Sequence, residues 1–292
     1  MIALRRLRTL DVAAASGLVV HDGRLHVVAD DDLFLHVYAD DGARRVARVP
    51  LFPGDLPADP AARKARKPDL EALVLVPGAG LLALGSGSRP NRRSGALVPL
   101  PAGEAGPARA VDLAPLYEAL GARFTALNVE GAAVAGATLR LLQRGNGLGG
   151  ASAVVDLDLA GVVDALARGR PLDGALVRDV HAVELGTLGG VPLAFTDASP
   201  LGDGRIAFAA AAEATPDVYE DGPCAGAALG VLDAGAALVH LEPVDEPLKV
   251  EGLHAFAPSS DGSVDVLVVA DADDPSRPTP LCCATLRPRG PS

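Results

Sequence analysis

The feature that most constrains the fold is a short step that recurs along the chain, in which an acidic residue and a glycine open an apolar stretch. The clear copies are Glu130-Gly131-Ala132 and Glu251-Gly252-Leu253. Weaker copies are Glu71-Ala72-Leu73, Ser16-Gly17-Leu18 and Asp197-Ala198. If the first residue of each copy is taken as an anchor, the spacings along the chain are 55, 59, 67 and 54 residues. A nearly constant period of this size predicts a repeat protein such as a propeller.

Each period contains the material for one four-stranded antiparallel sheet, because short runs rich in Leu and β-branched residues alternate with Gly, Asp and Pro turns. The expected blades are residues 14–51, 68–113, 127–186, 190–242 and 249–287. The last blade is one strand short, and Ile2–Leu10 belongs to no other period, so we expect this segment to complete that blade and close the ring. The prediction is an all-β, five-bladed β-propeller in one domain over residues 1–292, with six blades as the alternative.

Two connections between strands carry helical signals. Residues 114–120 follow Asp112 and stop at Gly121, and residues 160–168 stop at Gly169, which predicts two short helices outside the ring. The basic run Arg63–Lys67 lies in the connection between the first two blades. It is interpreted either as a solvated loop or as a patch that captures an anionic substrate.

The composition excludes several classes of partner. The formal net charge of -11 disfavours nucleic acid and anionic membranes, which require a basic surface. Aromatic residues make up only 3% of the chain and Trp is absent, so few side chains could stack on bases. Charged residues interrupt the first twenty residues before a signal peptide could form, and the three cysteines have no disulfide spacing. We therefore expect a soluble, cytoplasmic, monomeric protein without a nucleic-acid or membrane partner.

Propeller topology gathers polar side chains at one face of the ring. The start of the first strand and the end of the second strand of each blade lie on the same face, because neighbouring strands are antiparallel. The anchors and the residues that follow the second strands should therefore meet at one mouth of the central channel. The second set consists of Asp30–Asp32, Ser86–Asn91, Arg144–Asn146, Glu213 and Asp271–Asp274.

The anchor carboxylates are the candidate metal ligands. Several Glu side chains around a narrow channel repel one another unless a positive charge compensates them. Calcium prefers oxygen ligands from carboxylates and amides, so Glu71, Glu130 and Glu251 are predicted to hold Ca²⁺. The alternative is internal pairing with lysine, because Lys67 and Lys249 stand just before anchor residues in a chain with only three lysines. The sequence leaves both alternatives open.

A substrate site is predicted at the same mouth. Lys67, Lys249 and Arg144 are expected to receive the anionic group of a small molecule, and Asn146 and Glu213 complete the predicted substrate-binding set. Glu213 also begins the longest polar loop, which ends at Pro223. The six histidines lack metal-ligand spacing, which disfavours zinc. His254 is a candidate general base, although a buried histidine in the core is the more common situation.

The phrases Ala15-Ser16-Gly17-Leu18, Glu130-Gly131-Ala132 and Glu251-Gly252-Leu253 resemble the blades of bacterial propellers grouped with the "esterase-like activity of phytase" domain. They are still more similar to a bacterial family of unknown function. The acidic channel mouth is distantly similar to the gluconolactonase and phosphotriesterase propellers, where Glu and Asn or Asp residues hold a catalytic calcium. The resemblance implies a calcium-assisted hydrolase of a phosphoester, ester or lactone. The alternative is a non-catalytic binding propeller with a structural Lys/Glu ring.

Overall fold

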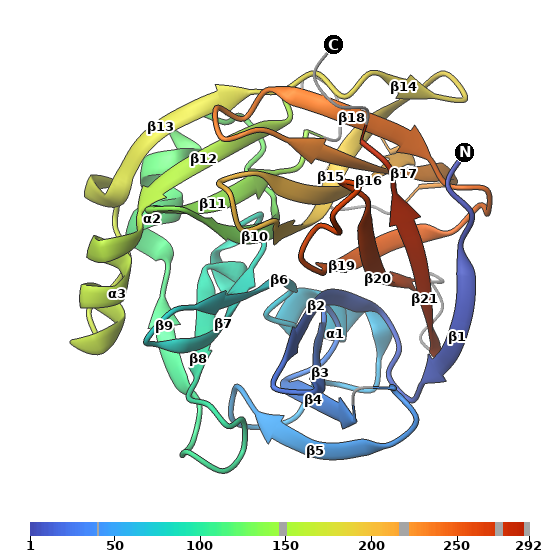
Figure 1. Cartoon of the computed structure of the whole chain (residues 1–292). Coiled ribbons are helices and arrows are strands. Elements are labelled where there is room, and N and C mark those ends of the chain that lie inside the picture. The colour runs from blue at the N-terminus through green and yellow to red at the C-terminus, as the bar shows by residue number, and fades with distance from the viewer. Residues whose placement is uncertain (40, 146–150, 216–221, 272–276, 289–292) are drawn as a thin grey trace.

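The structure is a computed structural model that describes residues 1–39, 41–145, 151–215, 222–271 and 277–288. Within these residues the long strands form five antiparallel sheets, which stand like blades around a central axis (Figure 1). Each sheet begins with a strand at this axis and ends at the outer surface. The predicted five-bladed β-propeller is therefore confirmed, and the six-bladed alternative is wrong.

The first blade contains β2 (Ala15–His21), β3 (Arg24–Ala29), β4 (Phe34–Ala39) and β5 (Arg45–Pro50). The second contains β6 (Leu70–Val76), β7 (Gly80–Gly85), β8 (Ser94–Val98) and β9 (Arg109–Asp112). The third blade contains β10 (Val129–Ala135), β11 (Thr138–Gln143), β12 (Ala153–Asp158) and β13 (Val177–Ala182). The fourth contains β15 (Val191–Pro200), β16 (Ile206–Glu213), β17 (Cys224–Leu232) and β18 (Leu238–Pro243), with the short β14 (Thr187–Leu188) paired to the start of β15. The fifth contains β19 (Lys249–Ala255), β20 (Val264–Asp271), β21 (Thr279–Leu286) and β1 (Arg5–Leu10).

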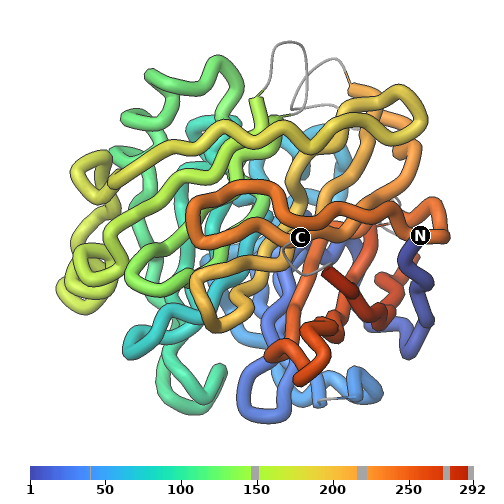
Figure 2. Tube along the Cα trace, turned by 45° about the horizontal axis from the view of Figure 1, so that its top comes forward, coloured from blue at the N-terminus to red at the C-terminus, as the bar shows by residue number. Residues whose placement is uncertain are grey.

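The N-terminal strand closes the ring. β1 pairs antiparallel with β21, so that Arg5 lies opposite Cys283 and Leu10 lies opposite Thr279. The start of the chain also reaches the fourth blade, where Ile2 forms a bridge with Val244. Figures 1 and 2 show the N-terminal segment running beside the last strands of the chain. The expected closing strand is confirmed, although it begins at Arg5 rather than at Ile2.

The core lies between the blades. Every residue of β7 and of β16 is buried, because each blade packs against a neighbour on both faces. One apolar cluster contains Ala133 from the third blade and Phe195 from the fourth. Phe195 meets Phe208 edge to face, with ring centroids 5.1 Å apart. Packing on both faces explains why these strands read as continuous apolar runs rather than alternating ones.

A β-bulge interrupts the innermost strand of every blade at the same place. The residues skipped by the strand pairing are Ser16, Glu71, Glu130, Thr196 and Glu251. A bulge re-aims the side chain at that position, which here directs five side chains toward the same mouth of the channel. Four of the five are the predicted anchors. The fourth blade is the exception, because Thr196 is the bulged residue and the predicted anchor Asp197 follows it.

The glycine of the recurring step has a packing role. A Cβ atom on Gly131 would lie 2.8 Å from the Cα atom of Asp197, and one on Gly17 would lie 2.9 Å from the backbone nitrogen of Leu73. Glycine therefore lets the innermost strands of neighbouring blades approach each other closely. The repeated motif therefore has a structural role, because it encodes a bulge followed by a close contact between blades.

Three α-helices connect the strands, α1 (Pro60–Arg66), α2 (Ala114–Gly121) and α3 (Leu159–Ala167), and two short 3₁₀ turns accompany them, η1 (Pro90–Arg92) and η2 (Gly174–Leu176). The helices α2 and α3 were predicted to within one residue. The prediction missed α1, because the basic run was interpreted as a loop or patch, whereas Asp59 caps a helix that Pro60 opens. None of the helices in the described part of the chain is both long and apolar enough to cross a membrane.

Candidate functional site

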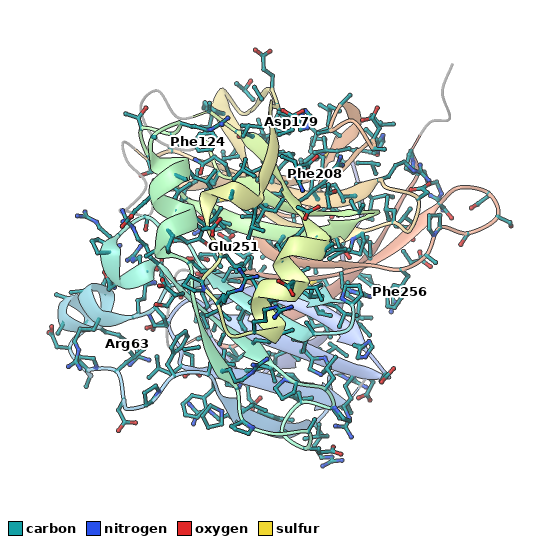
Figure 3. All side chains as sticks on the ribbon, turned by 90° about the vertical axis from the view of Figure 1, so that its left-hand side faces the viewer. Arg63, Phe124, Asp179, Phe208, Glu251 and Phe256 are labelled. Atoms are coloured by element: carbon teal, nitrogen blue, oxygen red, sulfur yellow. The ribbon has the colours of Figure 1, made fainter. Side chains whose placement is uncertain are left out.

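A cavity of about 820 Å³ opens at the channel mouth that carries the bulges. Its lining includes Glu71, Glu130 and Glu251 from the innermost strands. It also includes residues that follow second strands, together with Arg63 of α1. Figure 3 views the ring from the side and shows Glu251 in the interior, between Arg63 toward one face and Phe256 toward the other. The two sets of polar residues expected from the topology thus come together in one cavity.

Lys67 lies at the centre of the first charge cluster. Its Nζ atom forms an ion pair with Asp30 and lies 3.1 Å from Oδ1 of Asp69. Asp69 has a left-handed backbone with φ of 57°, and its Oδ2 accepts hydrogen bonds from Ser86 and Arg92, each at 2.6 Å. Burial lowers the pKa of Lys67, but Asp30 and Asp69 more than offset this effect, so the net shift is upward. Lys67 therefore remains a cation held by two carboxylates.

Arg144 and Lys249 form the second charge cluster. Nη1 of Arg144 donates to Glu130 at 3.2 Å, and Nη2 donates to Glu213 of the next blade. Nζ of Lys249 lies 3.1 Å from Oε1 of Glu251 and 3.8 Å from Oε1 of Glu213. All five side chains are more than nine-tenths buried. These ion pairs connect the third, fourth and fifth blades at the channel mouth.

Three carboxylate groups of the lining have acceptor atoms without a donor among the described residues. The half-buried Glu71 makes no hydrogen bond and no ion pair within this part of the chain. One oxygen of Glu251, Oε2, and one oxygen of Asp30, Oδ1, are buried and likewise lack a hydrogen-bond partner there. Buried acceptors are normally satisfied, so these atoms mark the surface that a ligand could contact.

Burial, together with the neighbouring carboxylates, raises several pKa values in the cavity. Burial raises the pKa of Glu71 well above its usual range, and the neighbouring Glu130 and Asp69 raise it further. Burial also raises the pKa of Glu130 to about 8, although Arg144 acts in the opposite direction. For Asp30, burial outweighs Lys67 and raises the pKa to about 6. The cavity therefore retains protons at neutral pH that isolated carboxyl groups would lose.

The predicted metal ligands do not share one environment. Glu130 and Glu251 contact Arg144 and Lys249, whereas Glu71 has no such partner. Among the described residues, the group with spacing suited to a metal ion is Asp30, Asp69 and Glu71, whose ligand atoms lie within 4.8 Å of one another. Both aspartates lie on the face where the topology places the site, but no sequence pattern singled them out as metal ligands. Lys67 already lies against two members of this group.

Other predicted residues lie apart from the cavity or outside the described part of the chain. Asn146 and residues 272–274 belong to stretches that the structure does not describe, as does most of the loop after Glu213. Burial lowers the pKa of His254 to about 4, and its Nδ1 accepts a hydrogen bond from the backbone of Val20 at 3.3 Å. His254 does not line the cavity, and its contacts are those of a packed core residue.

His36 lines the cavity, although the sequence analysis did not identify it as a site residue. Nη1 of Arg45 lies 2.9 Å from Nδ1 of His36, and Nε2 of His36 lies 2.9 Å from Oδ2 of Asp32. Because Arg45 can only donate, Nδ1 accepts and the ring proton is assigned to Nε2, which donates to Asp32. Both ring nitrogens are thus engaged, and His36 acts as a link between Arg45 and Asp32. The spacing of four residues between Asp32 and His36 was the available signal.

The two bulged residues without a carboxylate hold neighbouring blades together. The hydroxyl group of Ser16 donates to the carbonyl oxygen of Leu70, directly before Glu71. The hydroxyl group of Thr196 donates in the same way to the carbonyl oxygen of Val250, directly before Glu251, at 2.7 Å. Each hydroxyl therefore fixes the backbone that presents the next Glu to the cavity.

Residues 11–286 match the profile of a family described as "Family of unknown function (DUF6929)". The chain belongs to this family. The expected similarity to a family of unknown function is thereby confirmed, while the similarity to phytase-like and gluconolactonase propellers stays a prediction. No curated protein matches the sequence.

Solved structures with a similar fold include the glutaminyl cyclase of Myxococcus xanthus, with 12% identity, a TM-score of 0.54 and coverage of 98% of both chains. A putative glycoside hydrolase from Parabacteroides distasonis has 11% identity and a TM-score of 0.52, with coverage of 98% of this chain and 94% of the other. A glycosyl hydrolase from Bacteroides ovatus has 11% identity and a TM-score of 0.51, with coverage of 98% and 87%. At this level of identity the similarity shows the fold alone.

Proposed function

We propose that the channel-mouth cavity is the active site of a hydrolase for a small polar substrate, with Glu71 as the general acid. A general acid must hold its proton at the working pH and must be able to reach the substrate. Glu71 lines the cavity, and burial raises its pKa well above the usual range. Its carboxyl group makes no hydrogen bond or ion pair within the described chain, so it is available to contact a substrate.

Glu130 is the second carboxyl group of the proposed site. Asn128 donates to its Oε1 at 2.6 Å and Arg144 donates to its Oε2 at 3.2 Å, so its orientation is fixed. Two neighbouring carboxylates repel, so at least one of Glu71 and Glu130 retains a proton at neutral pH. Pairs of carboxyl groups in different surroundings commonly divide acid and base roles in hydrolysis.

The substrate classes under consideration are a phosphoester, an ester and a lactone. Lys67, Arg144 and Lys249 each contact carboxylates, which favours an uncharged ester or lactone over a phosphoester. In a calcium-assisted version of the proposal, Asp30, Asp69 and Glu71 would hold the ion. Calcium would polarise the substrate, and Glu71 would then be ionised and unable to serve as the acid.

The test is hydrolysis of chromogenic esters, lactones and phosphoesters by the wild type and by Glu71→Gln. Loss of the general acid should lower kcat/KM by about 10²- to 10⁴-fold. Glu104→Gln is the matched control, because Glu104 is 61% exposed and pairs with Arg24 far from the channel, and it should leave the rate unchanged. Absence of turnover with every substrate, or full activity of Glu71→Gln, would contradict the proposal. Loss of activity in EDTA with recovery in Ca²⁺ would support the calcium-assisted version instead.

The second candidate is a non-catalytic binding propeller. The observation in its favour is that Arg144 connects Glu130 to Glu213 across two blades, while Lys249 pairs with Glu251. Ion pairs of this kind can serve the ring itself rather than a reaction. This candidate requires that no substrate is turned over by the wild type, so the same assays distinguish the two.

A further inference from the structure

We propose that the ligand of the channel-mouth cavity carries a positively charged ammonium group, which Glu71 and Glu251 receive. The inference goes beyond the proposed function, because it concerns binding alone. An ammonium group paired with Glu71 would ionise that carboxyl group, which could then not act as the acid, so this ligand is distinct from the hydrolysed substrate. Binding itself does not depend on catalysis. It can therefore be tested separately from any reaction.

Glu251 is the first observation. The residue is only 5% exposed and lines the cavity, and its Oε1 lies 3.1 Å from Nζ of Lys249. Its other oxygen, Oε2, has no hydrogen-bond partner among the described residues. A buried carboxylate oxygen without a donor is costly, by about 1–3 kcal/mol or more. A ligand that brings a donor to Oε2 removes this penalty.

The charge of the lining is the second observation. Among the described residues that line the cavity, ten are Asp or Glu and eight are Lys or Arg. The buried lining atoms without a hydrogen-bond partner in the described chain include Oδ1 of Asp30 and Oε2 of Glu251, and also a donor, Nε of Arg144. Nζ of Lys67 and the Nη atoms of Arg144 contact carboxylates, and an anionic ligand would have to break these pairs. A cationic ligand would correct the imbalance.

The arrangement favours an organic ammonium group over a bare metal ion. The acceptor atoms without partners come from three blades, through Asp30, Glu71 and Glu251. Calcium needs several oxygens converging at about 2.3–2.6 Å, but Glu251 is not part of the group with metal-like spacing. An ammonium group donates three hydrogen bonds at ordinary distances, and an organic molecule can carry two such groups to separate acceptors.

A neutral polyol would also bring hydrogen-bond donors to the acceptor atoms of the cavity. It carries no positive charge, so it should bind the carboxylates less strongly than an amine of the same length. Comparing the two probes therefore separates a cationic ligand from a hydroxylated one.

The experiment is isothermal titration of the full-length protein with four-carbon probes that differ in charge. We expect 1,4-diaminobutane to bind, and 1,4-butanediol and succinate to bind at least about tenfold more weakly. Spermidine extends the series to a longer amine, and CaCl₂ tests the metal ion.

Variants locate the binding site. Glu71→Gln should weaken diamine binding by about tenfold. Glu251→Gln should weaken binding to a similar extent, and circular dichroism checks its fold because this change also removes a partner of Lys249. The exposed Glu104→Gln should bind like the wild type. Because Glu71 makes no ion pair within the described chain, Glu71→Gln remains informative even if Glu251→Gln fails to fold.

The outcomes separate this inference from the proposed function. If neither amine binds at about 10 mM, or if succinate binds more tightly than the diamine, the inference is wrong whatever the hydrolase assays show. Calcium binding that depends on Glu71, without amine binding, overturns it in favour of a metal ion. Diamine binding lost in both variants supports it. If that binding occurs without any hydrolysis, the ammonium site stands and the proposed function fails.

Discussion

Two buried arginines, one within β11 and one directly after it, have opposite surroundings. Arg140, within β11, is 2% exposed, and its Nε lies 3.0 Å from Asp156 on the neighbouring strand. Its Nη atoms donate to the carbonyl oxygens of Asp233, Ala234 and Gly204 in turns of the fourth blade. These contacts lie at the end of the ring away from the bulges. Here the charge is matched and the backbone acceptors are satisfied.

Arg144 follows the other end of the same strand and is 5% exposed. It donates to Glu130 and Glu213, but the surrounding carboxylates outnumber the cations. Glu71 and one oxygen of Glu251 are left without a donor in the described chain. Arg140 therefore stabilises the contact between the third and fourth blades. Arg144 lies in a site whose remaining acceptors face a cavity, which is the pattern expected of a binding site.

The largest expected effect on stability follows removal of the Arg140 contacts between the third and fourth blades. Arg140→Met should lower the free energy of unfolding by about 3–5 kcal/mol, because it leaves Asp156 as an uncompensated buried charge. Urea unfolding measures this change. Arg144→Met should cost less, about 1–3 kcal/mol, because Glu130 can take up a proton and Lys249 still lies near Glu213.

Two controls sharpen the comparison. Arg168→Met removes an arginine that is 68% exposed and pairs with Asp164 on α3, so it should leave the stability nearly unchanged. Adding Asp156→Asn to Arg140→Met should recover part of the loss, since it removes the unpaired charge. Equal losses for Arg140→Met and Arg144→Met would show that the two ends of the strand do not differ as described.

The next effect concerns pH and Glu71. Its pKa is raised in the folded protein above its ordinary value of 4.5, so the folded state binds more protons than the unfolded state above that pH. Stability should therefore fall as pH rises above about 4.5, by at most about 1.4 kcal/mol per pH unit for this carboxyl group. Glu71→Gln should remove this part of the slope and be more stable than the wild type on the alkaline side of this range. Unfolding curves across pH measure the difference, and a steeper slope in the variant would contradict it.

The ring was predictable because its construction repeats a local chemistry. A bulge followed by a close contact between blades requires a small residue directly after the bulge. The sequence has one in four of the five periods, at Gly17, Ala72, Gly131 and Gly252, whereas Asp197 follows the bulge of the fourth blade. The closing strand could be predicted because β1 had no partner elsewhere. The fourth anchor was misplaced by one residue because Thr196 and Asp197 both resemble the motif, and only the strand register distinguishes them.

The sequence predicts which residues of the site lie close together, but not which of them contact each other. Topology brings Glu71, Glu130 and Glu251 to one mouth of the channel. Which charge contacts which depends on backbone and side-chain geometry that has no sequence signature. Asp69, for example, reaches Arg92 from a left-handed backbone conformation that only the fold reveals.

The last prediction concerns the hydroxyl groups of Ser16 and Thr196. It tests whether they stabilise the contact between neighbouring blades or form part of the ligand site. Thr196→Val removes the hydrogen bond to the carbonyl oxygen of Val250 while preserving the shape of the side chain. It should lower the free energy of unfolding by about 1–2 kcal/mol, because that buried carbonyl loses a donor. Amine binding should weaken slightly, since Val250 precedes Glu251 and holds it in place. Ser16→Ala removes the equivalent bond to Leu70, before Glu71, and serves as the comparison. Unchanged stability in both variants, together with lost binding, would place these hydroxyls in the ligand site instead.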